Sequence, residues 1–305
     1  MRVNVNLELG INLGFAINKY IEPEEWARIV GEGLNLRHVQ FVADLLNPFL
    51  PGDYIEEQIE RIQESTEKYN VKIDSVFTSA FTRVNHLMHP DSKARRIWIN
   101  WFKDLFKIAA RLGAKNGGSH FGTLTFASYK DKEVREKLIE EGVKGWQELS
   151  FYAKEIGFDC LIFEPMSIPR EMANTVEETL ELMERVNENS GVPLKICLDV
   201  GHAPHPDQRD PYIWIERLAQ YTPIIHLQQT VMNKSYHWPF IPEYNKQGII
   251  HPGKVLRAIE KSGATESQLI QLVFEISHRE HWDTDFRIIE DLKSSVDYWR
   301  PYVKE

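Results

Sequence analysis

Short apolar runs alternate with longer amphipathic segments along the whole chain. Each run is rich in apolar or β-branched residues and is flanked by polar or glycine-containing turns, which is typical of buried β-strands. The predicted strands are residues 3–9, 36–42, 71–78, 116–120, 159–164, 194–199, 224–228 and 270–275. Eight strands with helical segments between them predict an α/β fold, a single closed (β/α)8 TIM barrel, rather than an open doubly wound sheet.

Helix start and stop signals support this alternation. Residues 22–34 have Pro23 and acidic residues in their first turn, as the start of a helix does. Residues 174–191 begin at Asn174, a residue suited to an N-cap, and end at Gly191. No change of composition or Gly/Ser-rich linker divides the chain, so we expect one domain over residues 1–305.

Composition and charge limit the classes of partner that this protein is expected to bind. The 305 residues are 42% hydrophobic and 27% charged, with a net charge of -9. Proteins that neutralise phosphate backbones are usually basic, so this charge disfavours nucleic acid as a partner. No apolar run approaches the ~18 residues of a membrane span, and the start of the chain lacks a signal-peptide core. We therefore expect a cytoplasmic protein, in which Cys160 and Cys197 are buried, reduced thiols.

Four consecutive predicted strands end in a polar group. The fifth ends at Glu164, the sixth at Asp199, the seventh carries His226 and the eighth ends at Glu275. In a TIM barrel the carboxyl ends of the strands form the functional face. These side chains are therefore expected to converge near the barrel axis.

Convergence creates a problem of charge. Carboxylates brought together in an apolar setting repel one another, and isolated buried charge costs several kcal/mol. A divalent cation removes the conflict, and oxygen and imidazole ligands suit Mn²⁺, Co²⁺, Mg²⁺ or Zn²⁺. One acid at one strand end is more often a solvated rim residue or an arginine partner. Four such ends in succession favour a shared metal site, with Mn²⁺ as the expected ion.

Further polar residues lie in the loops of the same face. His120 ends the fourth strand and His202 follows the sixth. Either histidine could orient a ligand, hydrogen bond a substrate or be a core residue bonded to the backbone. Arg170, in the loop after the fifth strand, could grip a phosphate bidentately. The alternative for Arg170 is a pair with Glu171 or with a helix terminus.

The chain resembles the xylose-isomerase-like TIM barrels, closest to the ketose 3-epimerase branch and to isomerases of small sugars and sugar phosphates. The matching motifs are FEP at Glu164, DVGH at 199–202, HLQQ at His226, FEIS at Glu275 and GIIHPGKVLRAI at 248–259. The resemblance implies one divalent ion held by Glu164, Asp199, His226 and Glu275. It also implies that Glu164 and Glu275 act as acid and base, and that His202 binds a substrate oxygen.

Several positions depart from related branches. After His226 the free-hexulose epimerases often continue with an Asp and a downstream Arg, whereas this chain has leucine, two glutamines and Met232. Free-sugar epimerases commonly have an acid where Arg170 stands. The apurinic-endonuclease branch uses three zinc ions and extra histidines, which the third strand and residues 235–240 do not reproduce. These differences indicate one metal ion and leave room for a phosphorylated substrate.

The expected reaction is proton transfer next to the carbonyl of a small ketose or ketose phosphate, through an enediolate. Protonation on the opposite face of the same carbon gives a 3-epimer, and protonation of the neighbouring carbon gives an aldose–ketose isomer. Two other classes stay open: a metal-dependent hydrolase of the apurinic-endonuclease kind, and a non-catalytic sugar-binding barrel. Association into a homo-oligomer is expected, because barrels of this kind commonly associate.

Overall fold

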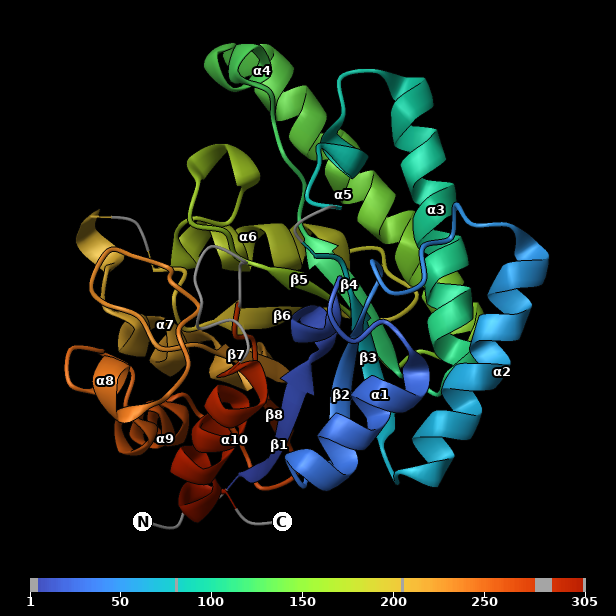
Figure 1. Ribbon diagram of the computed structural model, residues 1–305. Helices are drawn as coiled ribbons and strands as arrows, with labels where there is room; N and C mark the ends of the chain where they lie inside the picture. The colour runs from blue at the N-terminus through green and yellow to red at the C-terminus, as the bar shows by residue number, and fades with distance from the viewer. Residues whose placement is uncertain (1–4, 80–81, 204–205, 278–286, 304–305) are drawn as a thin grey trace. The chain divides into compact units, whose positions relative to one another are not determined.

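The structure is a computed structural model that describes residues 5–79, 82–203, 206–277 and 287–303. Eight parallel strands pair in sequence order and close into a barrel, with helices between them (Figure 1). The strands are β1 (Asn6–Asn12), β2 (His38–Val42), β3 (Lys72–Phe77), β4 (Asn116–His120), β5 (Cys160–Glu164), β6 (Leu194–Asp199), β7 (Ile224–Leu227) and β8 (Leu269–Phe274). The predicted (β/α)8 barrel is confirmed.

The helices follow the strands as the apolar spacing predicts. They are α1 (Pro23–Arg28), α2 (Gly52–Lys68), α3 (Ser92–Arg111), α4 (Phe126–Lys130), α5 (Lys132–Glu155), α6 (Val176–Asn187), α7 (Pro211–Leu218), α8 (Pro242–Asn245), α9 (Pro252–Lys261) and α10 (Ile288–Trp299). The start of α6 differs from the prediction, because Thr175 and not Asn174 is the N-cap. Thr175 Oγ1 accepts from the backbone N–H of Glu178, whose carboxylate in turn accepts from the N–H of Asn174.

By internal packing the chain forms two compact units. The first comprises Met1–Gln40, Glu60–Ile73 and Cys197–Glu305, and the second comprises Phe41–Ile59 and Asp74–Ile196. Each has its own aromatic core, and a buried aromatic ring removes about 150–250 Å² from water. In the first unit Phe240 packs edge-on against Trp299 at 5.4 Å between ring centroids. The single domain over residues 1–305 stays a prediction.

The core of the second unit is built around Trp146. Its ring lies 6.2 Å from the rings of both Phe102 and Phe121, and all three side chains are fully buried. The indole Nε1–H donates to the carbonyl of Phe121 at 2.9 Å, so burial leaves this polar group bonded. In the same unit β4 contains Gly118, where a Cβ would lie only 1.7 Å from the carbonyl oxygen of Ile162 on β5. Only glycine allows these two strands to approach so closely.

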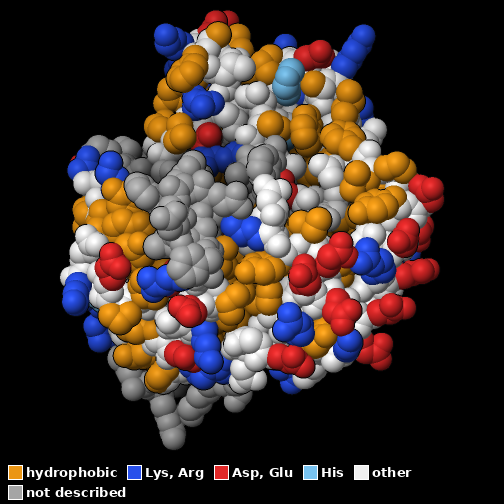
Figure 2. Space-filling model, in the orientation of Figure 1, with side chains coloured by type: hydrophobic (Ala, Val, Ile, Leu, Met, Phe, Trp, Pro, Cys, Tyr) orange, Lys and Arg blue, Asp and Glu red, His pale blue; other side chains and the backbone are white. Residues whose placement is uncertain are grey.

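The surface carries charges of both signs (Figure 2), and the two cysteines are buried as the sequence predicts. Acidic and basic side chains are interspersed on the face shown in Figure 2, and acidic ones gather on the side where α2 lies. Cys160 and Cys197 are both buried and form no disulfide, as predicted. Burial raises the pKa of the Cys160 thiol to about 11. Within the described ranges, no helix has the length and apolar content needed to cross a bilayer.

Candidate metal and catalytic site

Three of the four predicted ligands come together in the first unit. Asp199 is the last residue of β6, and its Cα pairs with that of His226 on β7. Glu275 follows the last residue of β8 directly, and its backbone N–H donates to the carbonyl of Leu227 at 3.0 Å. Each of these three side chains offers one ligand atom, and these atoms lie within 4.8 Å of one another.

Glu164, the fourth predicted ligand, belongs to the second unit. It is the last residue of β5, is only 7% exposed, and pairs across the ladder with His120 on β4. In the strand order β5 is followed by β6, whose last residue is Asp199. Glu164 therefore ends its strand as Asp199 does, and its role as a ligand stays a prediction.

The carboxylate of Asp199 is held from two sides. Its Oδ1 accepts from the backbone N–H of Gly201 at 2.5 Å and from Nε2 of Gln228 at 2.8 Å. The amide of Gln228 is oriented by the backbone N–H of His237, which donates to its Oε1 at 2.6 Å. A Cβ on Gly201 would lie 2.4 Å from Cδ of Gln228, so residue 201 must be glycine for this arrangement. The DVGH motif thus places its carboxylate rigidly.

The ring of His226 lies between the amide of Gln40 and the carboxylate of Glu275. Its Nδ1 lies 3.2 Å from Oε2 of Glu275, and its Nε2 lies 2.8 Å from Oε1 of Gln40 on β2. Burial raises the pKa of the Glu275 carboxyl, but the neighbouring imidazoles of His226 and His237 lower it by more. Glu275 is therefore ionised at neutral pH.

The donor set fits a divalent cation. Two carboxylates with oxygens no more than 4.8 Å apart repel each other by at least roughly 3 kcal/mol at an effective dielectric constant of about 20. Glu275 Oε2 is buried and makes no hydrogen bond among the described residues, although it faces His226 Nδ1. A cation between Asp199, His226 and Glu275 satisfies all three groups together. The two oxygens and one imidazole nitrogen are ligands that Mn²⁺, Co²⁺ and Zn²⁺ accept.

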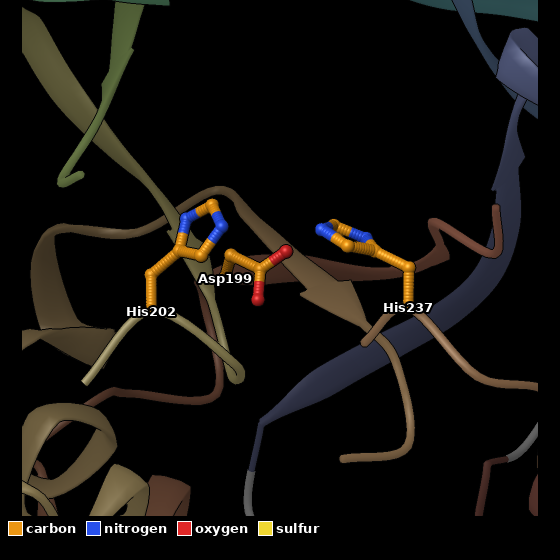
Figure 3. A group of neighbouring side chains, drawn as sticks. All are labelled: Asp199, His202 and His237. Atoms are coloured by element: carbon orange, nitrogen blue, oxygen red, sulfur yellow. The ribbon is translucent and has the colours of Figure 1, made fainter. Parts of the chain in front are cut away.

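A second group of possible ligands adjoins the first. Asp199, His202 and His237 also bring ligand atoms within 4.8 Å of one another, and Figure 3 shows the carboxylate between the two imidazole rings. His237 Nδ1 lies 3.0 Å from the carbonyl of Glu275, to which it can only donate. Its Nε2 then accepts from Gln228 Nε2, 3.2 Å away. With both ring nitrogens engaged, His237 is better suited to positioning Glu275 and Gln228 than to holding a second ion.

His120 is engaged in a different network, within the second unit. Its Nε2 lies 3.0 Å from the carbonyl of Val84, so it donates there, and its Nδ1 lies 3.1 Å from Oγ of Ser119. Burial is the main cause that lowers the pKa of His120 to about 3. The ring is neutral, and both of its nitrogens are used by the protein. This geometry favours the structural alternative over a contact with substrate.

Arg170 is held by its own unit as well. Its Nη1 donates to the carbonyl of Leu124 at 3.0 Å, and its guanidinium lies 4.9 Å from the ring centroid of Phe126. Glu171, the alternative partner considered from the sequence, pairs with Arg83 instead. A grip on phosphate by Arg170 stays a prediction.

Three polar residues that shape the site were not predicted from the sequence: Gln40, Gln228 and His237. Gln40 is a fully buried amide inside the apolar strand β2, and this interruption was a readable signal. Gln228 comes two residues after His226, which places both side chains on the same side of an extended chain. His237 had no comparable signal, because its backbone adopts a left-handed conformation, with a φ of 49°, in the loop after β7.

Comparison with known proteins agrees with this fold. The family model for the xylose isomerase-like TIM barrel matches residues 19–299. The chain therefore belongs to the xylose isomerase-like TIM barrel family. The resemblance inferred from its motifs is confirmed at the level of the family.

Individual relatives cover nearly the whole chain. D-Erythrulose 1-phosphate 3-epimerase of Brucella abortus (strain 2308) is 31% identical over 302 residues, which span 97% of this chain and 96% of that protein. A crystal structure from Rhodospirillum rubrum matches 98% of this chain and all of its own, with a TM-score of 0.87 and 23% identity. The structure of the IolI protein with a bound zinc atom matches the same shares, with a TM-score of 0.70 and 18% identity. At these identities the two structures show the fold alone.

Proposed function

We propose that this chain is a divalent-metal-dependent 3-epimerase of a small ketose phosphate. The observation that carries the proposal is the cluster of Asp199, His226 and Glu275 at the carboxyl ends of β6, β7 and β8. The 31% identity to a D-erythrulose 1-phosphate 3-epimerase supports epimerisation over aldose–ketose isomerisation, and a phosphorylated over a free sugar. The substrate class is then a ketose of about four carbons with a terminal phosphate.

The proposed ion is held by Glu164, Asp199, His226 and Glu275. When bound, such an ion acts as a Lewis acid that stabilises the negative charge developing on the substrate's oxygens. Mn²⁺ is the proposed ion, and the zinc atom bound to the IolI protein, which has a similar fold, supports the binding of a metal. The engagement of both ring nitrogens of His237 supports one ion rather than two.

The proton transfers are assigned to the two glutamates. Glu275 is ionised, so it is ready to accept the proton bound to C3 of the ketose. Glu164, from the other unit, returns a proton to the opposite face of the same carbon. Removal of the C3 proton gives an enediolate, and protonation of this intermediate on the opposite face inverts C3. His202 is proposed to bind a substrate oxygen, and Arg170 to contact the phosphate through N–H groups other than the one bonded to Leu124.

Exchange of the substrate's carbon-bound hydrogen with solvent tests the proposal directly. The chain, loaded with Mn²⁺, is incubated in D₂O with D-erythrulose 1-phosphate and with free erythrulose, and deuterium at C3 is followed by NMR. We expect rapid exchange and 3-epimer formation with the phosphate. Glu164→Gln and Glu275→Gln are each expected to abolish exchange, while Glu171→Gln, a buried acid paired with Arg83, retains it. Undiminished exchange in both site variants would remove the assignment of acid and base.

The metal is tested separately. Elemental analysis of the purified protein is expected to find about one divalent ion per chain, and removal by chelation is expected to stop exchange until Mn²⁺ is restored. A protein that holds no ion and retains full activity after chelation contradicts metal dependence. Two or three ions per chain would instead favour the hydrolase class.

A further inference from the structure

The two ring nitrogens of His226 face different chemistry. Nδ1 faces the carboxylate of Glu275 and so the proposed ion, while Nε2 faces Gln40 Oε1. A neutral imidazole carries a single proton, and only the nitrogen without it can bind a metal. Which nitrogen holds the proton therefore decides whether His226 can be a ligand at all.

A chain of hydrogen bonds that starts at the backbone settles this choice. The N–H of Gly14 can only donate, and it bonds to Oδ1 of Asn12 at 2.7 Å. This contact sets the orientation of the Asn12 amide, whose Nδ2 then donates to Gln40 Oε1 at 2.7 Å. A Cβ at Gly14 would lie 2.9 Å from Asn12 Oδ1, so the close contact depends on glycine. Asn12 and Gln40 are neighbours across the β1–β2 ladder, which keeps the two amides in register.

The orientation of Gln40 then decides the proton on His226. Because Gln40 presents its oxygen, which can only accept, His226 Nε2 must be the donor across the 2.8 Å contact. The reverse orientation of this amide would put its NH₂ group against Asn12 Nδ2, donor against donor. Gln40 Nε2 is buried and makes no hydrogen bond within the described part of the chain, which is the cost of keeping the oxygen aimed at His226. Cys197 Sγ, 3.3 Å from the same Nε2, is a weak second acceptor.

We propose that Asn12 and Gln40 are positioning residues that hold His226 as the Nε2-protonated tautomer and so present Nδ1 to the divalent ion. Neither residue touches the ion or the substrate. They act through His226, in the way that hydrogen-bond partners behind metal-bound histidines fix ring and tautomer. The role of the ion in this inference rests on the proposed function. Asn12 and Gln40 hold the proton on Nε2 with or without the ion, whereas Nδ1, 3.2 Å from the Glu275 carboxylate, can also carry a proton until an ion displaces it.

The sharpest variant is Asn12→Asp, which is nearly isosteric. The new carboxylate still accepts from the N–H of Gly14, but it now presents an oxygen to Gln40. The Gln40 amide is then expected to turn, so that its NH₂ group faces both the carboxylate and His226. His226 Nε2 becomes an acceptor, the proton moves to Nδ1, and the ligand position is closed. Loss of packing alone would not move a proton between two nitrogens.

Nitrogen-15 NMR of histidine-labelled, metal-free protein reads the tautomer, with the His226 signals assigned by their absence from His226→Gln. Wild type is expected to show a protonated Nε2, and Asn12→Asp an unprotonated Nε2 with the proton on Nδ1. An unprotonated Nε2 in wild type, or a protonated Nε2 in both proteins, would overturn the proposal.

Metal affinity, measured by competition with a chelator for Mn²⁺, gives the second readout. Gln40→Met removes the acceptor at similar volume and is expected to weaken binding by about 10–100-fold. Gln40→Glu keeps an acceptor for Nε2–H and is expected to restore most of this loss. Gln271→Met, the same change at a buried glutamine of β8 bonded to Glu8, is the matched control and is expected to bind like wild type. Equal weakening in Gln40→Met and Gln271→Met would indicate a general structural effect and overturn the proposed positioning role of Asn12 and Gln40.

The two proposals fail in different ways. If wild type binds no divalent ion, the proposed function falls, whatever the tautomer. If wild type binds Mn²⁺ and Asn12→Asp and Gln40→Met bind it as tightly as wild type, the metal site stands and the positioning role of Asn12 and Gln40 is wrong.

Discussion

His226 and His120 are both buried histidines near the carboxyl end of a barrel strand, yet the structure uses them in opposite ways. His226 bonds to a glutamine oxygen on one side and turns its other nitrogen toward the carboxylate of Glu275. His120 bonds to a carbonyl and to a serine hydroxyl, so neither nitrogen is left for a ligand. Burial does not distinguish the two residues, because both are at most 3% exposed. Position does not distinguish them either, because His120 is the last residue of β4 and His226 the last but one of β7.

The hydrogen-bond partners make the difference. A histidine whose neighbours are neutral and complementary is a structural element, and burial keeps it uncharged. A histidine that faces two carboxylates instead becomes part of a charged cluster, which a cation stabilises. The comparison predicts that substitutions in the two networks separate cleanly: one set affects metal and catalysis, and the other affects stability.

The largest expected effect is that of Glu275→Gln on catalysis. The amide cannot accept the proton of the substrate, so kcat for epimerisation is expected to fall by at least about 10³-fold, the upper part of the usual range for a lost general base. Steady-state kinetics with Mn²⁺ in excess measures it. A tenfold loss or less would show that Glu275 is only a ligand and would weaken the contrast between the two networks.

The matched pair His226→Asn and His120→Asn tests the comparison itself. Mn²⁺ at 100 times its Kd should stabilise wild type by about 2.7 kcal/mol. We expect this gain to disappear in His226→Asn and to persist in His120→Asn. Conversely, His120→Asn should lower the free energy of unfolding of the metal-free protein by about 2–3 kcal/mol, because it leaves buried partners unbonded. Denaturant unfolding with and without Mn²⁺ gives both values, and loss of the metal gain in His120→Asn would break the distinction.

The pH dependence of stability follows from His86, which lies beside His120 with 4.3 Å between ring centroids. Burial, and secondarily the His120 imidazole, lower the pKa of His86 well below its usual value of 6.5. His120, with a pKa of about 3, behaves in the same way, so the unfolded chain binds protons below pH ~6.5 that the folded chain does not. Stability therefore falls as the pH drops, by up to about 1.4 kcal/mol per pH unit for each of the two histidines.

His86→Asn removes one of these protons and tolerates the left-handed backbone at this position, where φ is 29°. Its free energy of unfolding should depend less steeply on pH between 6.5 and 5 than that of wild type, as measured by urea denaturation at several pH values. Parallel slopes in the two proteins would assign the pH dependence to other groups.

The smallest expected effect concerns Arg170. Arg170→Ala should raise the KM for a ketose phosphate several-fold more than the KM for the free ketose, if the guanidinium reaches the phosphate. Arg83→Ala, which removes the partner of Glu171, is the comparison for a loss of loop structure. Equal changes in both KM values would make Arg170 a structural residue, anchored by Leu124 and Phe126 as His120 is by its own partners.

Much of this molecule was readable from the sequence. The period of apolar residues predicted the eight strands and the closed barrel, because a strand buried on both faces must be apolar over a short length. The first strand was predicted at residues 3–9, three residues before β1 (Asn6–Asn12). The same pattern located Asp199, His226 and Glu275, since a polar residue that ends such a strand has to emerge at one face of the barrel. The capping rules placed the start of α6 one residue too early, because Thr175 and not Asn174 is the N-cap.

Tertiary structure alone decided which histidine has a nitrogen to offer. His226 and Gln40 are 186 residues apart, and the amide that orients Gln40 belongs to another strand again. Hydrogen-bond donors and acceptors act over about 3 Å and depend on direction, so sequence spacing cannot show which distant groups meet. The residue types of the site were therefore determined by the chain itself, and the state of each side chain was determined by the fold that surrounds it.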